Sequence, residues 1–120
     1  MTRYKITLPM PHRDLGKNRE RNIHWSRKAK LIKEHRVDAQ LSAWAVVKGR
    51  PKHKLLNAKP TFYLPDKRKR DRVNLAGMLH PAWDGFQDAG LIEDDAGLIL
   101  HPCEIKYDKD NPRVEIELWV

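Results

Sequence analysis

The chain has 120 residues and a formal net charge of +8, with 40% of its residues hydrophobic and 33% charged. This length and apolar content predict one domain over residues 1–120 with a single core, and they exclude a disordered chain. No apolar run approaches the roughly 20 residues of a membrane-spanning helix, no signal-peptide segment opens the chain, and the single cysteine, Cys103, predicts a cytoplasmic protein without disulfides.

The first half of the chain predicts two strands and one helix. Tyr4–Leu8 alternates apolar and polar residues, which is typical of a strand. Ser26 is the expected N-cap of a helix that ends before Gly49. Residues 52–59 predict a basic connection, and Thr61–Leu64 predicts a short strand.

The second half predicts one more helix and two more strands. An apolar stripe that begins near Asn74 predicts a helix ending at Gly90, with a kink or a restart at Pro81. Leu98–Leu100 and Glu104–Tyr107 predict strand segments around Pro102, and Val114–Val120 predicts the final strand. The order strand, helix, strand, helix, strand, strand predicts an α+β domain, in which two main helices pack on a mixed four-stranded sheet.

Charge is distributed unevenly along the chain. Residues 1–72 contain 21 Lys and Arg against 6 Asp and Glu, a net charge of +15. Residues 73–120 contain 3 against 10, a net charge of −7. This asymmetry predicts a polyanion-binding face beside an acidic cluster, with nucleic acid as the partner.

Five of the six residues in segment 67–72 are basic, and the exception is Asp71. A carboxylate inside such a run repels the phosphate that the neighbouring cations attract. One interpretation is a solvated loop with internally neutralised charge. The other is a bound divalent metal ion, which reverses the local charge and can face a phosphate directly.

A second group of carboxylates, Glu93-Asp94-Asp95, follows the predicted second helix, whereas Asp71 precedes it. A helix of about 16 residues spans about 24 Å, so the two loops meet only if the chain returns. Leu98–Leu100 would provide that return by pairing beside the strand that ends at Leu64. Carboxylates meeting from two loops would bind Mg²⁺ or Mn²⁺. A hydrophilic turn is the alternative interpretation of residues 93–95.

Three segments together carry a resemblance to a known family: Leu64-Pro65-Asp66 with the basic run and Val73-Asn74-Leu75, then Asp84-Gly85, then residues 89–95. They resemble the RusA family of Holliday junction resolvases, which has a basic run, an Asp-x-Asp-Asn-Leu motif, a helix lysine and a glycine-led turn ending in Asp-Asp. The opening segment Ile6-Thr7-Leu8-Pro9-Met10-Pro11 is also similar to the family.

The resemblance implies a homodimeric, Mg²⁺-dependent endonuclease that nicks two opposed strands of a four-way DNA junction during recombination and repair. It implies a bacterial or phage-encoded protein that acts without a membrane or a small-molecule cofactor. Asp71 and Asp95 correspond to metal ligands of the catalytic site, with Asp94 beside them. Asn74 corresponds to the motif asparagine, which is expected to cap the helix or support the ligands.

Two positions depart from the family pattern. Val73 stands where the second motif aspartate is expected, and His80 stands at the helix lysine. Water, Glu93, Asp94 or Asp84 would then complete the metal coordination. His80 is expected to contact phosphate or act as a catalytic base, or else it is an exposed helix residue. These departures leave open a catalytically impaired protein of the same fold that binds branched DNA.

The basic residues are expected to grip DNA phosphates, through contacts that depend on salt and carry little sequence information. A basic RNA-associated protein is a third interpretation, although the chain lacks the paired aromatic residues of RNA-recognition motifs. The predicted DNA contacts are Lys67, Arg68, Lys69, Arg70 and Arg72 beside the metal, and Arg19, Arg21 and Arg27 in the early loop and first helix.

Overall fold

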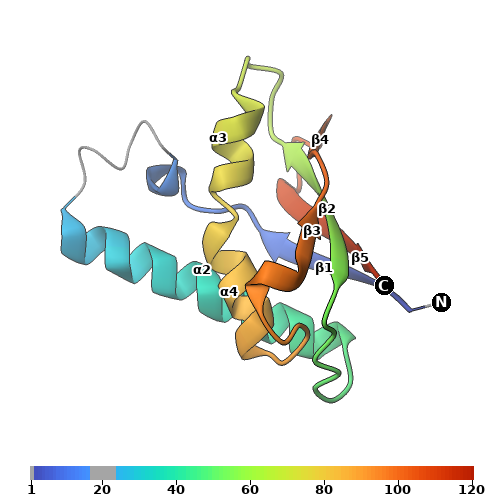
Figure 1. Cartoon of the computed structure of the whole chain (residues 1–120). Coiled ribbons are helices and arrows are strands. Elements are labelled where there is room, and N and C mark those ends of the chain that lie inside the picture. The colour runs from blue at the N-terminus through green and yellow to red at the C-terminus, as the bar shows by residue number, and fades with distance from the viewer. Residues whose placement is uncertain (1, 17–23) are drawn as a thin grey trace.

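A computed structural model describes residues 2–16 and 24–120 of the chain. It confirms the expected α+β class, since a mixed sheet stands beside the helices in Figure 1. The elements in chain order are β1 (Arg3–Pro9), η1 (Arg13–Leu15), α2 (Trp25–Val46), β2 (Leu56–Leu64), α3 (Arg72–Gly77), α4 (His80–Asp88), η2 (Asp95–Gly97), β3 (Leu98–Leu100), β4 (Glu104–Tyr107) and β5 (Arg113–Trp119).

The two strand segments predicted around Pro102 are present with the expected bounds, as β3 and β4. They are separate strands, so the sheet has five strands where four were expected. β1 and β2 flank β5 on its two sides, and both pair with it in the antiparallel direction. β3 and β4 both pair in parallel with the other edge of β2, the former with Leu56–Ala58 and the latter with Thr61–Leu64. The expected pairing of Leu98–Leu100 beside β2 is therefore present.

β2 begins at Leu56, five residues before the predicted start at Thr61. The predicted basic connection over residues 52–59 is therefore wrong in its second half. Lys59 and Pro60 interrupt the apolar pattern within this strand. They also coincide with the gap between the β3 and β4 pairings. Pro60 has no backbone N–H to donate, so β2 offers one hydrogen-bond donor fewer at this point. The strands that pair with β2 are interrupted here, between β3 and β4.

α2 begins one residue before the predicted N-cap. The side chain of His24 accepts the backbone N–H of Ser26 at 3.2 Å and caps the helix in place of Ser26 itself. Gly49 follows the end of the helix with φ of 76°, a left-handed conformation that glycine adopts at little cost.

The predicted second helix is two helices, as the position of Pro81 indicated. α3 ends at Gly77, and α4 starts at His80 with Pro81 in its first turn, where a missing N–H leaves no hydrogen bond unmade. Asp71, and not Asn74, is the N-cap of α3, since it accepts the backbone N–H groups of Val73 and Asn74. Figure 1 shows α3 stacked above α4.

The core lies between the sheet and the helices. Ile6, Phe62, Phe86 and Ile116 are fully buried there, and burying each such side chain stabilises the fold by about 1.5–3 kcal/mol. α2 and α4 pack closely at Gly85, because a Cβ on that residue would meet the backbone carbonyl of Arg36. Among the described residues, no helix combines the length and the apolar character that crossing a membrane requires.

Candidate nucleic-acid interface

Much of the acidic charge in the second half of the chain is neutralised on the sheet. Lys5 and Arg3 of β1 pair with Glu115 and Glu117 of β5 at 2.8 and 3.9 Å. Both are diagonal pairs, since the register sets Lys5 directly opposite Glu117 and Arg3 opposite Trp119. The hydrogen bond from Lys5 is the main reason that the pKa of Glu115 is lowered. In the folded chain, basic residues of the first half therefore neutralise part of the acidic charge of the second half. The cations that remain available to bind a polyanion lie away from this part of the sheet.

Several of those cations surround one groove of about 500 Å³, called here the basic groove. It lies where the end of β2, the start of α3 and the segment after β1 meet. Apolar side chains alternate with arginine, lysine and one carboxylate around it. Its lining residues are Met10, Pro11, Arg13, Leu64, Pro65, Arg68, Lys69, Arg70, Asp71, Asn74, Leu75, Met78 and Pro112.

Asp66, which no sequence signal had marked as functional, organises the basic run. Its carboxylate accepts the backbone N–H of Arg68 at 3.0 Å and pairs with the guanidinium groups of Arg68 and Arg70 at 3.1 and 2.9 Å. The bond from the Arg68 backbone N–H is the largest cause that lowers the pKa of Asp66. The spacing could have revealed this, because an aspartate bonds the N–H two residues on and reaches a cation four residues on.

The remaining cations of the run are held by different partners. Arg72 donates to the carbonyl of Cys103 at 3.1 Å, which ties the start of α3 to the β3–β4 connection. The ammonium of Lys67 lies 5.7 Å from the ring centre of Tyr107. Lys69 is exposed and lines the basic groove. Arg68, Lys69 and Arg70 are therefore the members of the run that line the groove.

The other predicted DNA contacts lie in the segment before α2 and at its start. Arg27, in the first turn of α2, has its guanidinium 3.4 Å from the ring of His12. His12 is the neighbour of Arg13, which lines the groove, so Arg27 can extend the positive surface from it. Arg19 and Arg21 lie outside the described residues.

Asp71 borders the basic groove and holds the start of α3. Its Oδ1 atom accepts the backbone N–H groups of Val73 at 2.9 Å and Asn74 at 3.4 Å. Asn74 also lies close to Gly16, since a Cβ on that glycine would be 3.2 Å from the Asn74 amide nitrogen. Val73 is 73% exposed, so the position of the missing motif aspartate faces solvent.

Asp95 lies in a separate acidic group, called here the Asp95 cluster, with Asp94, Asp84 and His80. The hydrogen bond with Asp94 raises the pKa of Asp95, and the charge of Asp84 raises it further. The backbone N–H of Ala96 lowers the pKa of Asp94. His80 Nδ1 lies 3.9 Å from Asp84 Oδ2. His80 and Asp84 are four residues apart on α4 and therefore share one face of the helix, and the fold adds Asp95 to them.

The two predicted metal ligands are anchored at different points. Asp71 caps the first turn of α3, whereas the backbone N–H of Asp95 donates to the Gln87 side chain in the last turn of α4 at 3.2 Å. Within residues 2–16 and 24–120, no three His, Cys, Asp or Glu side chains are grouped so as to hold a metal ion. Asp94 and Asp95 offer the hard carboxylate oxygens that Mg²⁺ prefers, but the described residues do not gather them with a third ligand.

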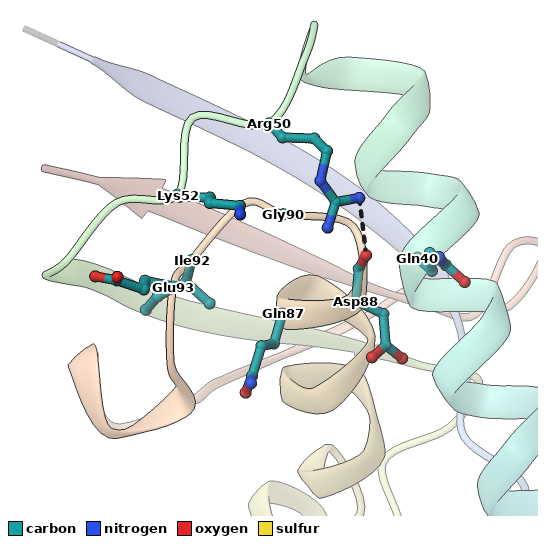
Figure 2. Close-up of a pocket in the computed structure, with 8 residues that line it drawn as sticks. All are labelled: Gln40, Arg50, Lys52, Gln87, Asp88, Gly90, Ile92 and Glu93. Carbon is teal, nitrogen blue, oxygen red and sulfur yellow. Dashed lines mark hydrogen bonds between the residues drawn. The ribbon is translucent and has the colours of Figure 1, made fainter.

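A second hollow of about 530 Å³ lies at the far end of α4 (Figure 2). Arg50 donates to the backbone carbonyl of Asp88 there at 3.2 Å, and Lys52 lies beside it. The Asp88 carboxylate is paired with Arg36, so Glu93 is the carboxylate of this hollow that can offset Arg50 and Lys52. A polyanion therefore gains less from this hollow than from the basic groove. It is lined by Gln40, Arg50, Lys52, Gln87, Asp88, Gly90, Ile92 and Glu93.

Comparison with known proteins yields one informative relative. No protein-family model matches the chain. A protein of Xylella fastidiosa (strain Temecula1 / ATCC 700964), named only "Uncharacterized protein", is 33% identical over 101 residues, which cover 81% of this chain and 63% of the relative. The chain thus spans about 63% of the relative's length. The relative's name assigns no activity, so the functional assignment comes from the basic groove and the residues around it.

Proposed function

We propose that this protein is a Mg²⁺-dependent, structure-specific DNA endonuclease of the RusA type. It would resolve four-way junctions by paired symmetric nicks during recombination and repair in a bacterial cytoplasm, encoded by the host or by a phage. The observation that carries the proposal is the basic groove, where three cations of the motif segment and Arg13 line the same hollow as Asp71. A sugar–phosphate strand lying in this groove would pass directly over Asp71.

The chain's own residues have distinct roles in this proposal. Arg13, Lys69 and the Asp66-bound Arg68 and Arg70 would hold phosphates at the groove, which positions the strand without reading its sequence. The apolar lining excludes water around the held backbone and strengthens each charge contact. Branch recognition would come from the shape of the junction and from two sites held in a symmetric homodimer.

The acidic residues would provide the metal site. Asp71 has one carboxylate oxygen in the helix cap and its Oδ2 atom outside that cap, and Asp94 and Asp95 offer further hard oxygen donors. Bound Mg²⁺, or Mn²⁺ in its place, would supply an activated water and stabilise charge on the leaving oxygen. His80, oriented by Asp84 at 3.9 Å, would exchange a proton near Asp95.

Two observations favour a second candidate, a protein of the same fold that binds branched DNA and cuts it poorly. Val73 is an exposed apolar residue at the position of the second motif aspartate. Asp71 and Asp95 are anchored at different ends of the α3–α4 segment. The cations of the basic groove serve both candidates equally, so junction binding is common to them and cleavage separates them.

The deciding experiment is cleavage of a synthetic four-way junction, compared with a linear duplex of the same sequence, in Mg²⁺ or Mn²⁺. If the protein is an endonuclease, it should nick the junction and not the duplex. Asp71→Asn should then reduce cleavage by more than the roughly 100-fold that is typical when a group supporting a metal ligand is lost. Asparagine is an equally good N-cap, so the variant should keep its melting temperature. Wild-type activity in Asp71→Asn would exclude the mechanism.

The binding protein makes the opposite prediction. Salt-sensitive junction binding without nicks in either metal would favour it, and Val73→Asp would then introduce cleavage by restoring a carboxylate beside Asp71. Val73→Asn is the matched control, because it adds a polar group of the same shape without the charge. Equal behaviour of the two variants would show that the missing carboxylate is not the cause.

A further inference from the structure

The segment between α2 and β2 carries a second group of cations, which the basic groove does not use. Lys48, Arg50, Lys52 and Lys54 are all exposed. None of the four forms an ion pair within the part of the chain that the structure describes. Residues 48–54 are called here the Arg50 loop. Unpaired cations so close in sequence repel one another, and a bound anion would relieve that repulsion.

Two of these cations are directed at the same space. Arg50 and Lys52 line the hollow of Figure 2, where the ammonium of Lys52 points toward the guanidinium of Arg50. The carboxylate of Glu93, which offsets part of this charge, points the other way. The second carboxylate of the hollow, Asp88, is paired with Arg36. Two neighbouring cations with donors facing one hollow are the chemistry that binds a phosphate group.

The guanidinium of Arg50 is held in position before any anion binds. One of its nitrogens, Nη1, donates to the backbone carbonyl of Asp88 at 3.2 Å. Its stem lies against Gly90, where an added Cβ would be 2.7 Å from the Arg50 Nε atom. An arginine has five N–H donors, so this single bond leaves others for a ligand. Arg50 is therefore a preorganised donor, which loses little freedom on binding.

Lys52 has a backbone conformation that a lysine disfavours. Its φ is 48°, in the left-handed region where a Cβ is crowded by the backbone. The conformation is held from outside, because the backbone N–H of Lys52 donates to the Gly90 carbonyl at 2.8 Å and that of His53 donates to the Leu91 carbonyl at 3.1 Å. Strain of this kind gathers at binding sites. Asparagine would fit the turn better, so the turn itself does not require a lysine here.

We propose that the Arg50 loop is a second phosphate-binding site, which contacts the same DNA arm as the basic groove. The loop precedes β2 and the basic run follows it, so the two sites lie at opposite ends of this strand (Figure 1). β2 has nine residues and spans about 26 Å. Phosphates recur about every 3.4 Å along a duplex strand, so the two contacts would be about eight base pairs apart. The inference rests on the DNA binding of the proposed function, and it does not depend on cleavage.

Lys52→Asn tests the second contact, because asparagine removes the charge and adopts the left-handed conformation more readily. Its melting temperature should equal or exceed that of the wild type. Its affinity for a four-way junction with long arms should be about three- to tenfold lower at low salt, and log affinity should depend less steeply on log salt, by about 0.9. Fluorescence anisotropy measures both. Unchanged affinity with a lower melting temperature would overturn the proposal, since Lys52 would then serve only the turn.

Lys33→Gln is the matched control for net charge. Lys33 is an exposed lysine of α2 and lies outside the Arg50 loop and the basic groove. It should bind the junction within about twofold of the wild type, because distant exposed charges are screened by salt. Equal weakening by Lys33→Gln and Lys52→Asn would mean that only net charge matters, which would also overturn the proposal.

Neutral linkages in the DNA test the position of the contact. Methylphosphonate groups, which carry no charge, would replace the phosphates from about seven to about nine nucleotides from the branch in every arm. They should weaken the wild type as much as Lys52→Asn does, and they should not weaken Lys52→Asn further. Equal losses in the two proteins would exclude a contact between Lys52 and these phosphates.

The two sites can fail separately, and Lys69→Gln in the basic groove distinguishes them. Weaker junction binding by Lys69→Gln alone would overturn the Arg50 loop proposal and leave the groove in place. Weaker binding by Lys52→Asn alone would support the loop and reject the groove. A wild type that does not bind the junction would overturn both.

Free phosphate offers the same chemistry as a DNA backbone, so calorimetric titration with inorganic phosphate completes the experiment. The wild type should show no saturable binding of phosphate, since one anion at this loop lacks the further contacts of a DNA arm. Saturable phosphate binding that Lys52→Asn abolishes, together with unchanged affinity for the junction, would assign the loop to a free phosphate group and overturn the DNA contact.

Discussion

Asp66 restrains the positive charge of the basic groove, and removing its charge should increase affinity for DNA. Its carboxylate holds the guanidinium groups of Arg68 and Arg70 at 3.1 and 2.9 Å. Asp66→Asn removes this charge, yet the amide oxygen still accepts the backbone N–H of Arg68, so the turn is retained. The variant should bind a four-way junction more tightly than the wild type does.

The size of the effect follows from the number of phosphates that the groove neutralises. Releasing the two arginines from Asp66 should add one phosphate contact, which steepens the dependence of log affinity on log salt by about 0.9. The gain should be roughly three- to tenfold at low salt. It should shrink about threefold as salt rises from about 50 to about 200 mM.

Fluorescence anisotropy with a labelled junction, titrated at several salt concentrations, measures both quantities. Glu117→Gln is the matched control, because Glu117 pairs with Arg3 at 3.9 Å on the sheet, outside the groove. The two variants raise the net charge equally. Equal tightening by both would mean that only net charge matters, and weaker binding by Asp66→Asn would refute the role given to the released arginines.

Two further predictions concern stability. Gly85→Ala should lower the free energy of unfolding by about 2 kcal/mol, because the new Cβ would meet the Arg36 carbonyl and lie 2.8 Å from Ala39 Cβ. Gly77→Ala is the control, since nothing lies within 4 Å of its Cβ, and it should raise the free energy of unfolding by up to about 1 kcal/mol. Urea titrations measure both. Burial lowers the pKa of His35 below that of the unfolded chain, so protons bind the unfolded state more readily and stability should fall as pH drops below about 6.5. The loss of stability is at most about 1.4 kcal/mol per pH unit between the His35 pKa of the folded chain and that of the unfolded chain. His35→Leu should remove this loss. If the variant is as sensitive to acid as the wild type, the effect belongs to other groups.

Local sequence signals determined most of the fold. Alternation identified the strands around Ile6 and Ile116, and Pro81 correctly marked the restart between α3 and α4. The start of β2 was missed because Lys59 and Pro60 break the apolar pattern, and only pairing with β5 on one side makes them strand residues. The bounds of β3 and β4 on the two sides of Pro102 were predicted correctly, but their separate pairings with one edge of β2 depend on contacts that the local pattern does not encode.

The candidate site was less predictable, because it depends on contacts between distant segments. The basic run was visible in the sequence, but its attachment to Asp66 and the tie from Arg72 to Cys103 depend on the folded loop. Asp71 was identified as a special carboxylate, and its capping role would have followed from its place directly before α3. The grouping of Asp95 with His80 required the chain to fold back along α4, which no local pattern encodes.

The capping role of Asp71 is compatible with its proposed role as a metal ligand. Both backbone N–H groups of the cap bond to the same oxygen, Oδ1, so the cap fixes the carboxylate plane without using Oδ2. Fixing a ligand through a neighbouring hydrogen bond is a common way to prepare a metal site. The N-terminus of a six-residue helix adds only a small positive potential, which disfavours a cation but favours the phosphate beside it. The same residue can therefore start a helix, border the basic groove and offer one oxygen to a metal that a bound phosphate brings with it.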